Sequence, residues 1–482
     1  MSEKYIIALD QGTSGCRAFA VDMQGRVYAQ QSRVFSPRRS GTGISEYNAE
    51  ELLHAQQEVL QALLDQIDPR RVLALAVCSQ RSTIVLWDKS TGQSVAPVLT
   101  WEDGRALQES VQAPLSQEEV HAQTGLFKTP FFSAPKIAWC LKHIPAARQA
   151  AQAGTLLAAP VASYLIWKLT CAQVFATDPT LAQRTLLWDI RTGQWSKTLT
   201  QAFGVPLACL PTVKPTMADY GHYEYRGVSI PIVVCTADQQ AAATYNGLVA
   251  GKTSINYGTG AFVLHHTGTK LVILPGMLSS VDVSDTSEST RFLLEGPVFS
   301  AGSVLQWLKT KGLLSDFVQI DALCATAQAP VQFLPALGGL GAPYWDYTVS
   351  VHTGGVYEKT RPADWVAGAL QGVALRVADI FGYLSAHGQQ TVDPVCVSGG
   401  LCQSHYLLSF EADVLQHTLQ VQNDTESTVL GTALLAMRYL YGTEQAWKTS
   451  AGHIFSPRMT QQQSQTVYQD WQQFVQIARS HG

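Results

Sequence analysis

The stretch Tyr5-Ile-Ile-Ala-Leu-Asp10-Gln-Gly-Thr-Ser-Gly-Cys-Arg17-Ala-Phe-Ala-Val21 decides the fold of this chain of 482 residues. An apolar run of strand length leads into a short polar turn with glycines, and the chain then becomes apolar again. This pattern predicts two strands joined by a tight turn. Residues 50–64 then show helical spacing of apolar side chains, and residues 72–78 form a nearly continuous apolar run. The alternation of strands and helices predicts an α/β fold.

A second strand, turn and strand is expected near the middle of the chain. Residues 228–235 are predicted to form a strand, and Asp238 is expected to open a helix. The segment Thr253-Ser-Ile-Asn-Tyr-Gly258-Thr-Gly260-Ala-Phe-Val-Leu-His265 then repeats the apolar, Gly-Thr and apolar pattern. A Gly-Thr turn therefore opens each half, but the similarity is too short to establish a duplication.

The second half continues with further helices and one short strand. The helices are expected near 299–311, 363–386, 404–415 and 428–440 and from residue 459 onward, with the strand at 395–397. A linker rich in proline, glycine and serine is missing between the halves. We therefore expect domains at 1–244 and 245–482 that pack against each other on either side of a cleft.

The charge balance argues against a nucleic-acid partner. Thirty-three Lys and Arg residues face 37 Asp and Glu residues, which gives a formal charge of -4 and no large basic field. Charged residues make up 15% of the chain and hydrophobic residues 46%, so the composition excludes disorder across the whole chain.

The N-terminus and the cysteines predict a cytoplasmic protein. The first apolar run is too short for a signal peptide, and the longest apolar stretch, 155–169, falls short of the roughly 20 residues that span a bilayer. No membrane insertion is expected. The nine cysteines lack zinc-site spacing and C-x-x-C pairs, so neither disulfides nor a structural metal is implied.

Two acidic positions are candidates for chemistry. Asp10 ends a strand and is followed by Gly12, Thr13 and Ser14, a combination that can bind phosphate and a hydrated magnesium ion. The same residues are also favoured in a simple hairpin turn. Asp238 begins a helix directly after a strand, where it could face a cleft or serve only as a helix cap.

Several motifs give the chain a resemblance to a known family. They are Asp10-Gln-Gly-Thr-Ser-Gly-Cys-Arg17, Ser79-Gln-Arg81, Thr100-Trp-Glu-Asp-Gly-Arg105, Asp238-Gln-Gln240, Tyr257-Gly-Thr-Gly260 and Gly338-Gly-Leu-Gly-Ala-Pro-Tyr-Trp-Asp346. Their order and spacing, over about residues 4 to 445, resemble the FGGY carbohydrate kinases and most of all the glycerol kinase branch. The resemblance implies two ribonuclease-H-like domains of the actin/hexokinase type that flank a catalytic cleft.

The resemblance also implies site residues, with ATP and Mg²⁺ as cofactors. Asp238 is the expected catalytic base, and Asp10 and Asp238 are the expected metal ligands. The implied acceptor pocket consists of Arg81, Ser82, Trp101, Phe131, Asp238, Gln239 and Phe262. The implied nucleotide site consists of Gly12, Thr13, Ser14, Arg17, Gly258, Thr259, Gly260, Gly302, Gln306, Gly400 and Ser404.

The sequence departs from the glycerol kinase pattern at a few places. Ser82 stands where those kinases carry Glu, Phe131 where they carry Tyr, and His405 where they usually carry Asn. The stretch after Asp346 lacks the usual Arg-Gly pair. Each change at the acceptor pocket removes a polar group, and sites that bind a hydroxyl discriminate strongly when such a partner is lost.

The predicted function is ATP-dependent phosphorylation of a hydroxyl of a small polyol or sugar. A glycerol-like acceptor leads, followed by a tetritol, a pentitol or a ketose. One alternative is a degenerate, actin-like ATP-binding protein that acts as a sensor or assembly factor, and another is an ATP hydrolase. A homodimer and a homotetramer are both compatible with the sequence.

Overall fold

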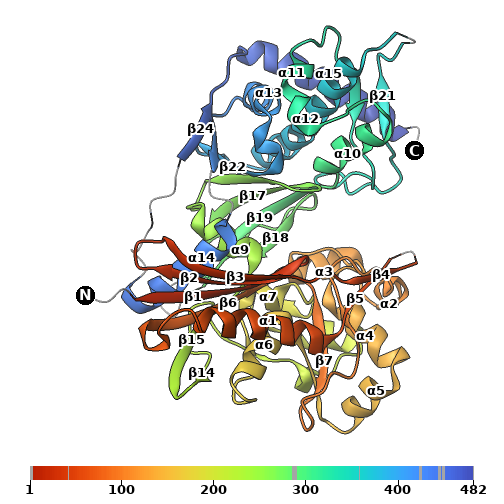
Figure 1. Ribbon diagram of the computed structural model, residues 1–482. Coiled ribbons are helices and arrows are strands. Elements are labelled where there is room, and N and C mark those ends of the chain that lie inside the picture. Colours follow the sequence, from red (N-terminus) through yellow and green to blue (C-terminus); the bar gives the residue numbers. More distant parts are fainter. Residues whose placement is uncertain are drawn as a thin grey trace. The chain divides into compact units, whose positions relative to one another are not determined.

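The computed structural model describes residues 4–41, 43–284, 290–357, 359–422, 426–442, 447 and 451–480. The chain forms two compact units (Figure 1). The first contains Met1–Gly247, Ser279–Phe292 and Glu426–Lys448, and the second contains Leu248–Leu278, Leu293–Thr425 and Thr449–Gly482. Each unit is therefore discontinuous in sequence, whereas the ranges 1–244 and 245–482 that we expected are continuous.

The first unit is built on a six-stranded mixed sheet. Its strands, in spatial order, are β14 (His222–Tyr225), β15 (Val228–Ala237), β6 (Val72–Ser79), β1 (Tyr5–Gln11), β2 (Gly15–Asp22) and β3 (Val27–Val34). A second sheet has the order β4 (Arg38–Ser40), β5 (Ile44–Tyr47), β8 (Val98–Leu99), β7 (Ile84–Asp88) and β9 (Leu156–Pro160). Two small ladders pair β10 (Ala176–Thr177) with β13 (Thr212–Val213), and β11 (Trp188–Asp189) with β12 (Gln194–Trp195).

Helices of the first unit connect and cover these sheets. They are α1 (Ala49–Leu64), α2 (Leu107–Gln112), α3 (Gln117–Thr124), α4 (Ser133–His143), α5 (Pro145–Gln152), α6 (Val161–Leu169), α7 (Pro179–Gln183), α8 (Lys197–Ala202), α9 (Asp238–Tyr245) and α14 (Ser427–Tyr441). Figure 1 shows α1 and α6 on one face of the large sheet and α9 and α14 on the other.

Strand β1 is buried on both faces, which explains its unbroken apolar sequence. Ile6 and Ala8 belong to the cluster that contains Leu434 of α14. Their neighbours Tyr5, Ile7 and Leu9 belong to the opposite cluster, which contains residues of α1 and α6. Because successive side chains of a strand point to opposite faces, a strand with a helix on each side needs apolar residues throughout.

Helix α14 packs closely on α9, although about 180 residues separate them in the sequence. A Cβ atom at Gly431 would lie 1.9 Å from the carbonyl oxygen of Ala241, so only glycine permits this approach. The helix that we expected near 428–440 therefore exists, but it completes the first unit.

The second unit is built on a seven-stranded sheet. Its order is β18 (Leu278–Val281), β19 (Phe292–Val298), β17 (Ala261–Gly268), β16 (Thr253–Tyr257), β22 (Val395–Gly399), β23 (Leu419–Gln422) and β24 (Ala451–Phe455), of which β18 and the start of β19 are counted with the first unit. A separate ladder pairs β20 (Gln332–Leu334) with β21 (His352–Gly354). The helices are α10 (Gly302–Thr310), α11 (Ile320–Cys324), α12 (Pro362–Ala386), α13 (His405–Leu415) and α15 (Gln461–Ser480).

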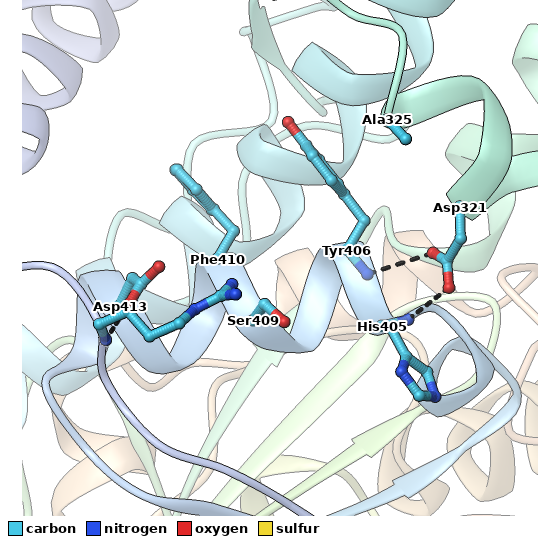
Figure 2. A pocket seen from close by; sticks show the side chains of 8 residues that line it. Asp321, Ala325, His405, Tyr406, Ser409, Phe410 and Asp413 are labelled. Carbon is cyan, nitrogen blue, oxygen red and sulfur yellow. Dashed lines mark hydrogen bonds between the residues drawn. The ribbon is translucent and has the colours of Figure 1, made fainter.

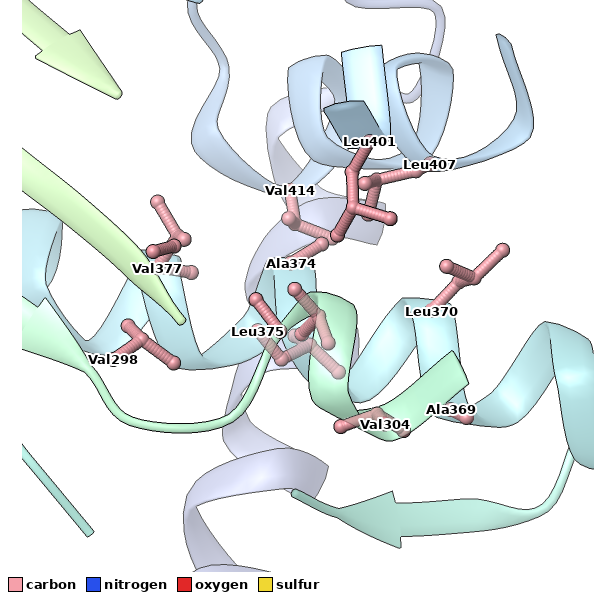
Figure 3. Close-up of a cluster of buried hydrophobic side chains, with 14 of the residues drawn as sticks. Val298, Val304, Ala369, Leu370, Ala374, Leu375, Val377, Leu401, Leu407 and Val414 are labelled. Carbon is pink, nitrogen blue, oxygen red and sulfur yellow. The ribbon is translucent and has the colours of Figure 1, made fainter. Parts of the chain in front are cut away.

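Helix α12 forms the centre of the second core. Figure 3 shows its Leu370 and Ala374 in one cluster with Val304 of α10 and with Leu407 and Val414 of α13. Most residues of this helix are buried, which fits its nearly continuous apolar sequence. Among the described residues, no helix is both long and apolar enough to cross a membrane.

An ion pair lies inside this core. The Arg376 guanidinium and the Asp379 carboxylate, one turn apart on α12, are bonded to each other, and both residues are about 1–2% exposed. Arg376 also donates to the carbonyl oxygen of Ala342 at 2.6 Å, and Trp471 of α15 donates its indole N–H to Asp379 at 3.1 Å. Burial raises the pKa of Asp379, so its ionised form depends on these partners.

We predict that Arg376→Met lowers the free energy of unfolding by about 3 kcal/mol or more, because it leaves a buried carboxylate without its cation. Urea denaturation followed by tryptophan fluorescence measures the change. The control is Arg70→Met, which removes the partner of Asp68 in an ion pair that is exposed on both sides and should leave the free energy of unfolding nearly unchanged. Equal losses in the two variants would contradict the prediction.

Candidate active site

The parallel register of β15, β6 and β1 brings three loops of the first unit to one edge of the sheet. Asp10 lies opposite Cys78, which lies opposite Thr236, and Gln11, Ser79 and Ala237 form the next row. The three strands end together within this row. The turn after Gln11, the Gln80-Arg81 segment and Asp238 therefore leave the sheet at the same edge, the place where α/β proteins bind ligands.

Asp10 is buried and bonded to a guanidinium. Its Oδ2 accepts from Nε of Arg17 at 3.1 Å and from Nη2 at 2.6 Å, and the residue is 4% exposed. Arg17 also forms an ion pair with Glu426, just before α14. The thiol of Cys78 lies 3.5 Å from Oδ1 of Asp10. Arg17 thus balances two carboxylates, of which the sequence pointed only to Asp10.

Asp238 is the first residue of α9, and Ala237 is the N-cap. The interpretation of Asp238 as the cap residue is therefore wrong. Its Oδ1 accepts from the backbone N–H of Gln239 at 2.8 Å. The side chain is half-buried, and burial raises its pKa from 3.8 to about 6. The Arg81 cation opposes this rise, and the Asp10 carboxylate adds to it.

The turn after β1 is fixed by side chains from two other segments. The N–H of Gly12 donates to the carbonyl oxygen of Gly15 at 3.0 Å and closes the turn. Gln80 donates its amide to the Gly12 carbonyl oxygen at 3.2 Å, and the Tyr47 hydroxyl donates to the Thr13 carbonyl oxygen at 2.6 Å. The carbonyls of Gly12 and Thr13 are therefore bound by protein groups. Thr13 is half-buried and Ser14 is exposed.

Trp101 is joined to this turn. Its indole N–H donates to the hydroxyl oxygen of Thr13 at 2.9 Å, and its backbone N–H donates to the hydroxyl of Thr83 at 3.0 Å. Both threonine hydroxyls in turn donate to the amide oxygen of Gln80, at 3.4 and 3.0 Å. The Trp101 side chain remains 43% exposed, so it is not a core residue. Gln80 thus connects the predicted phosphate turn with the predicted acceptor pocket.

Arg81 is bonded to another residue of the predicted acceptor pocket. Its guanidinium donates to the amide oxygen of Gln239 at 2.5 Å. Ser82 follows with a left-handed backbone, φ 62°, and is 9% exposed, whereas Phe131 is 46% exposed. Phe262, the remaining residue predicted for the pocket, is half-buried on β17 of the second unit, opposite Asn256.

The second unit contains a similar turn that contacts a helix. The N–H of Gly258 donates to Gly260 at 2.8 Å, and the N–H of Gly302 donates to the Gly258 carbonyl oxygen at 3.1 Å. A Cβ atom at Gly302 would lie 2.5 Å from that oxygen, so the glycine permits the contact. The structure therefore brings the Gly258-Thr-Gly260 turn together with the start of α10, where Gln306 is exposed.

Ser404 caps helix α13. Its hydroxyl accepts from the N–H of Leu407 at 3.2 Å and donates to Asp321 at 2.8 Å, while Gly400 is exposed one turn earlier. Asp321 also accepts from the backbone N–H groups of His405 and Tyr406 (Figure 2). A role of Ser404 in adenosine binding stays a prediction, and its hydroxyl already has two protein partners.

A pocket of about 390 Å³ lies beside this cap, and Figure 2 shows the side chains that line it. It is lined by Asp321, Ala325, His405, Tyr406, Ser409, Phe410, Asp413 and Arg458. The residues assigned to the phosphates, the adenosine and the acceptor do not line this pocket. His405, one of the departures from the glycerol kinase pattern, does line it, and Asp321 joins it to the predicted adenosine residue Ser404.

Comparison with known proteins decides the family. Residues 5–244 match the N-terminal domain of the FGGY family of carbohydrate kinases, and residues 253–440 match its C-terminal domain. The chain belongs to the FGGY family. The activity and the class of acceptor follow: an FGGY carbohydrate kinase transfers a phosphoryl group from ATP to a polyol or sugar.

Relatives of this FGGY kinase match it over its full length. The glycerol kinase of Shewanella halifaxensis is 34% identical over 99% of this chain and 100% of its own, and that of Limosilactobacillus reuteri is 32% identical over 100% of both chains. The Plasmodium falciparum glycerol kinase structure with ADP covers 99% of this chain and 98% of its own, with 24% identity and a TM-score of 0.92. The gluconate kinase structure from Lactobacillus acidophilus gives 20% identity and a TM-score of 0.86 over 99% and 98% of the two chains.

These findings confirm the predicted family, the actin/hexokinase-type fold and the class of enzyme. The individual site residues remain predictions. Sequence reasoning missed the supporting groups Gln80, Tyr47 and Glu426. It also missed Lys136, whose ammonium donates to the carbonyl oxygens of Ser82, Thr100 and Phe131. Gln80 lies inside a quoted motif, and Lys136 stands out as a charged residue in the apolar segment Ser133-Ala-Pro-Lys-Ile-Ala-Trp-Cys.

The departure after Asp346 has a structural counterpart. Asp346 accepts from Nε of Arg479 in α15 at 3.1 Å, and it also accepts from the hydroxyl of Thr348 at 2.6 Å. These two bonds lower the pKa of Asp346. The segment therefore has a guanidinium partner, supplied by the last helix of the chain.

Proposed function

We propose that this FGGY kinase transfers the γ-phosphoryl group of ATP to a primary hydroxyl of a small polyol, with a glycerol-like acceptor first and a tetritol, pentitol or ketose next. The observation that carries the proposal is the carboxylate of Asp238. It has a raised pKa and lies at the sheet edge where the Arg81–Gln239 pair and the Gly12–Gly15 turn also lie.

Asp238 is suited to accept a proton from the acceptor hydroxyl. A general base works best when its pKa approaches the working pH, and burial moves Asp238 in that direction. As the hydroxyl oxygen bonds to the γ-phosphorus, its proton passes to Asp238, and the bond from phosphorus to the bridging oxygen breaks to release ADP. Arg81 and Gln239 would hold acceptor hydroxyls, and Trp101 offers an apolar face for the C–H groups.

The nucleotide phosphates are assigned to both glycine turns. Thr13, Ser14 and Arg17 would contact them in the first unit, and Gly258, Thr259 and Gly260 in the second. In the Arg17–Asp10 pair a guanidinium that suits phosphate oxygens lies beside the predicted metal ligand. The adenosine assignment to Gly302, Gln306, Gly400 and Ser404 rests on the family resemblance.

Mg²⁺ fits the donors at this edge. It prefers carboxylate oxygens and is commonly held by one or two of them together with substrate phosphates. Asp10 and Asp238 supply such oxygens, and among the described residues Oδ1 of Asp10 meets only the weak thiol donor of Cys78. These two residues would hold the ion, which would neutralise charge on the transferring phosphate.

The alternatives lack a supporting observation. A pure ATP sensor has no use for the Arg81–Gln239 pair or for the half-exposed Trp101. An ATP hydrolase would need the base alone. Turnover of ATP against a panel of polyols, ketoses and sugar acids separates the three, because only a kinase consumes ATP in proportion to acceptor phosphorylated.

We predict that Asp238→Asn lowers phosphoryl transfer by about 10²-fold or more and leaves ATP affinity within a few-fold, because the amide cannot accept the proton. The Tm at pH 8 should equal or exceed that of the wild type. The raised pKa means that ionised Asp238 destabilises the fold above about pH 6, and Asn carries no charge. The control is Asp470→Asn, on an exposed position of α15. Retained turnover removes Asp238 from the mechanism.

The pH profile should follow the same carboxylate. Since Asp238 must be ionised to accept a proton and its pKa is about 6, kcat/KM for the acceptor should be level above this pH. Below it, kcat/KM should fall by about tenfold per pH unit. Steady-state rates at saturating ATP between pH 5 and 8 measure the inflection. A profile that stays level down to pH 5 would contradict the assignment, because an aspartate with the ordinary pKa of 3.8 is still ionised there.

The two departures at the acceptor pocket predict a change of specificity. Ser82→Glu combined with Phe131→Tyr should raise kcat/KM for glycerol by about tenfold or more and lower it for a bulkier native acceptor. Ser82 already has a positive φ, so Glu adds no new type of strain, and Phe131 has room for a hydroxyl because it is 46% exposed. The wild type and the double variant are each assayed with glycerol and with the bulkier acceptor. If the wild type already prefers glycerol and the double variant gains nothing, these positions do not set specificity.

A further inference from the structure

Lys136 is a buried cation on α4 that donates to three backbone carbonyls. Its Nζ lies 2.5 Å from the carbonyl oxygen of Thr100, 2.6 Å from that of Phe131 and 3.2 Å from that of Ser82. The residue is 0% exposed. An ammonium group has three N–H donors, so these three carbonyls use its full capacity.

The three carbonyls belong to three separate segments that carry the predicted acceptor pocket. Ser82 lies between β6 and β7, Thr100 directly precedes Trp101 after β8, and Phe131 precedes α4. A single side chain therefore ties together the backbone beside Ser82, Trp101 and Phe131. Ser133, one turn earlier on α4, adds a second donor to the Ser82 carbonyl at 3.3 Å.

Burial of this charge is costly for the fold. Desolvation lowers the pKa of Lys136, the Asp103 carboxylate opposes this and the Arg105 cation adds to it, so that the pKa is about 7. Asp103 is itself occupied, because it accepts from Arg105 and from the backbone N–H of Ser45. A core that needed only stability would place an apolar side chain here.

We propose that Lys136 is a positioning residue for the acceptor: its ammonium holds the loops of Ser82, Trp101 and Phe131 in the arrangement that the acceptor binds. The inference rests on the proposed function, since it takes these three residues to line the pocket. Lys136 acts through their backbone and touches no substrate. Small displacements of groups that orient a substrate can reduce a rate by about 10²-fold, so the three loops need such a support.

The test compares Lys136→Met with Lys142→Met. Methionine keeps the length and apolar stem of lysine and removes all three donors, and Lys142 is a half-exposed residue of the same helix that pairs with Glu109. For Lys136→Met we expect the acceptor KM to rise by about tenfold or more and the ATP KM to stay within about twofold. For Lys142→Met both KM values should stay within about twofold of the wild type.

The split between the two KM values distinguishes positioning from general damage. Partial unfolding reduces kcat through the amount of active enzyme and leaves both KM values unchanged. An unchanged acceptor KM, or an equal rise in both values, therefore overturns the inference. If Lys136→Met does not fold, Ser133→Ala gives the same readout: a rise in acceptor KM of about two- to fivefold supports the inference and no rise overturns it. Failure of the wild type to phosphorylate any polyol or sugar would instead refute the proposed function.

Discussion

The parallel pairing of β1, β6 and β15 is the constraint on which the predicted site depends. Its register places Gln11, Ser79 and Ala237 in one row, so that the first glycine turn, Arg81 and Asp238 follow from neighbouring strand ends. A shift by one residue would turn every side chain of a strand to its other face. The register is protected by burial, because β1 contributes Ile7 to one core and Ile6 to the other.

Charge is buried at this edge in three different ways. Asp10 is neutralised by a guanidinium that a second carboxylate shares. Asp238 forms no ion pair among the described residues, and burial raises its pKa. Lys136 is surrounded by neutral carbonyls. Each arrangement costs desolvation energy. The neighbouring groups that offset this cost are held in place by the two layers of helices that pack on the sheet.

The sequence was sufficient to predict the main helices and strands and to identify the motifs. The strand, turn and strand at Asp10 and at Gly258, the long helix α12 and the closing helix α15 all follow from local apolar patterns. The pattern could not show that α14 belongs to the first unit, because that depends on a contact between Gly431 and Ala241 far along the chain. For the same reason Gln80 and Lys136 were missed: their importance lies in contacts with other segments of the chain, which a local pattern of side chains does not show.

One hydroxyl, that of Thr13, belongs to both halves of the predicted chemistry. It accepts the indole N–H of Trp101 and donates to Gln80, and it lies in the turn assigned to phosphate. If the Thr13 hydroxyl donates its hydrogen bond to a phosphate oxygen and no longer to Gln80, Gln80 loses a donor. The Thr13 oxygen that accepts from Trp101 then becomes more polarised. The occupancy of one substrate site is then linked to that of the other, and linkage is reciprocal: whatever factor the nucleotide applies to acceptor affinity, the acceptor applies to nucleotide affinity. Substrate synergism would in that case need no domain movement and would begin at a single oxygen atom.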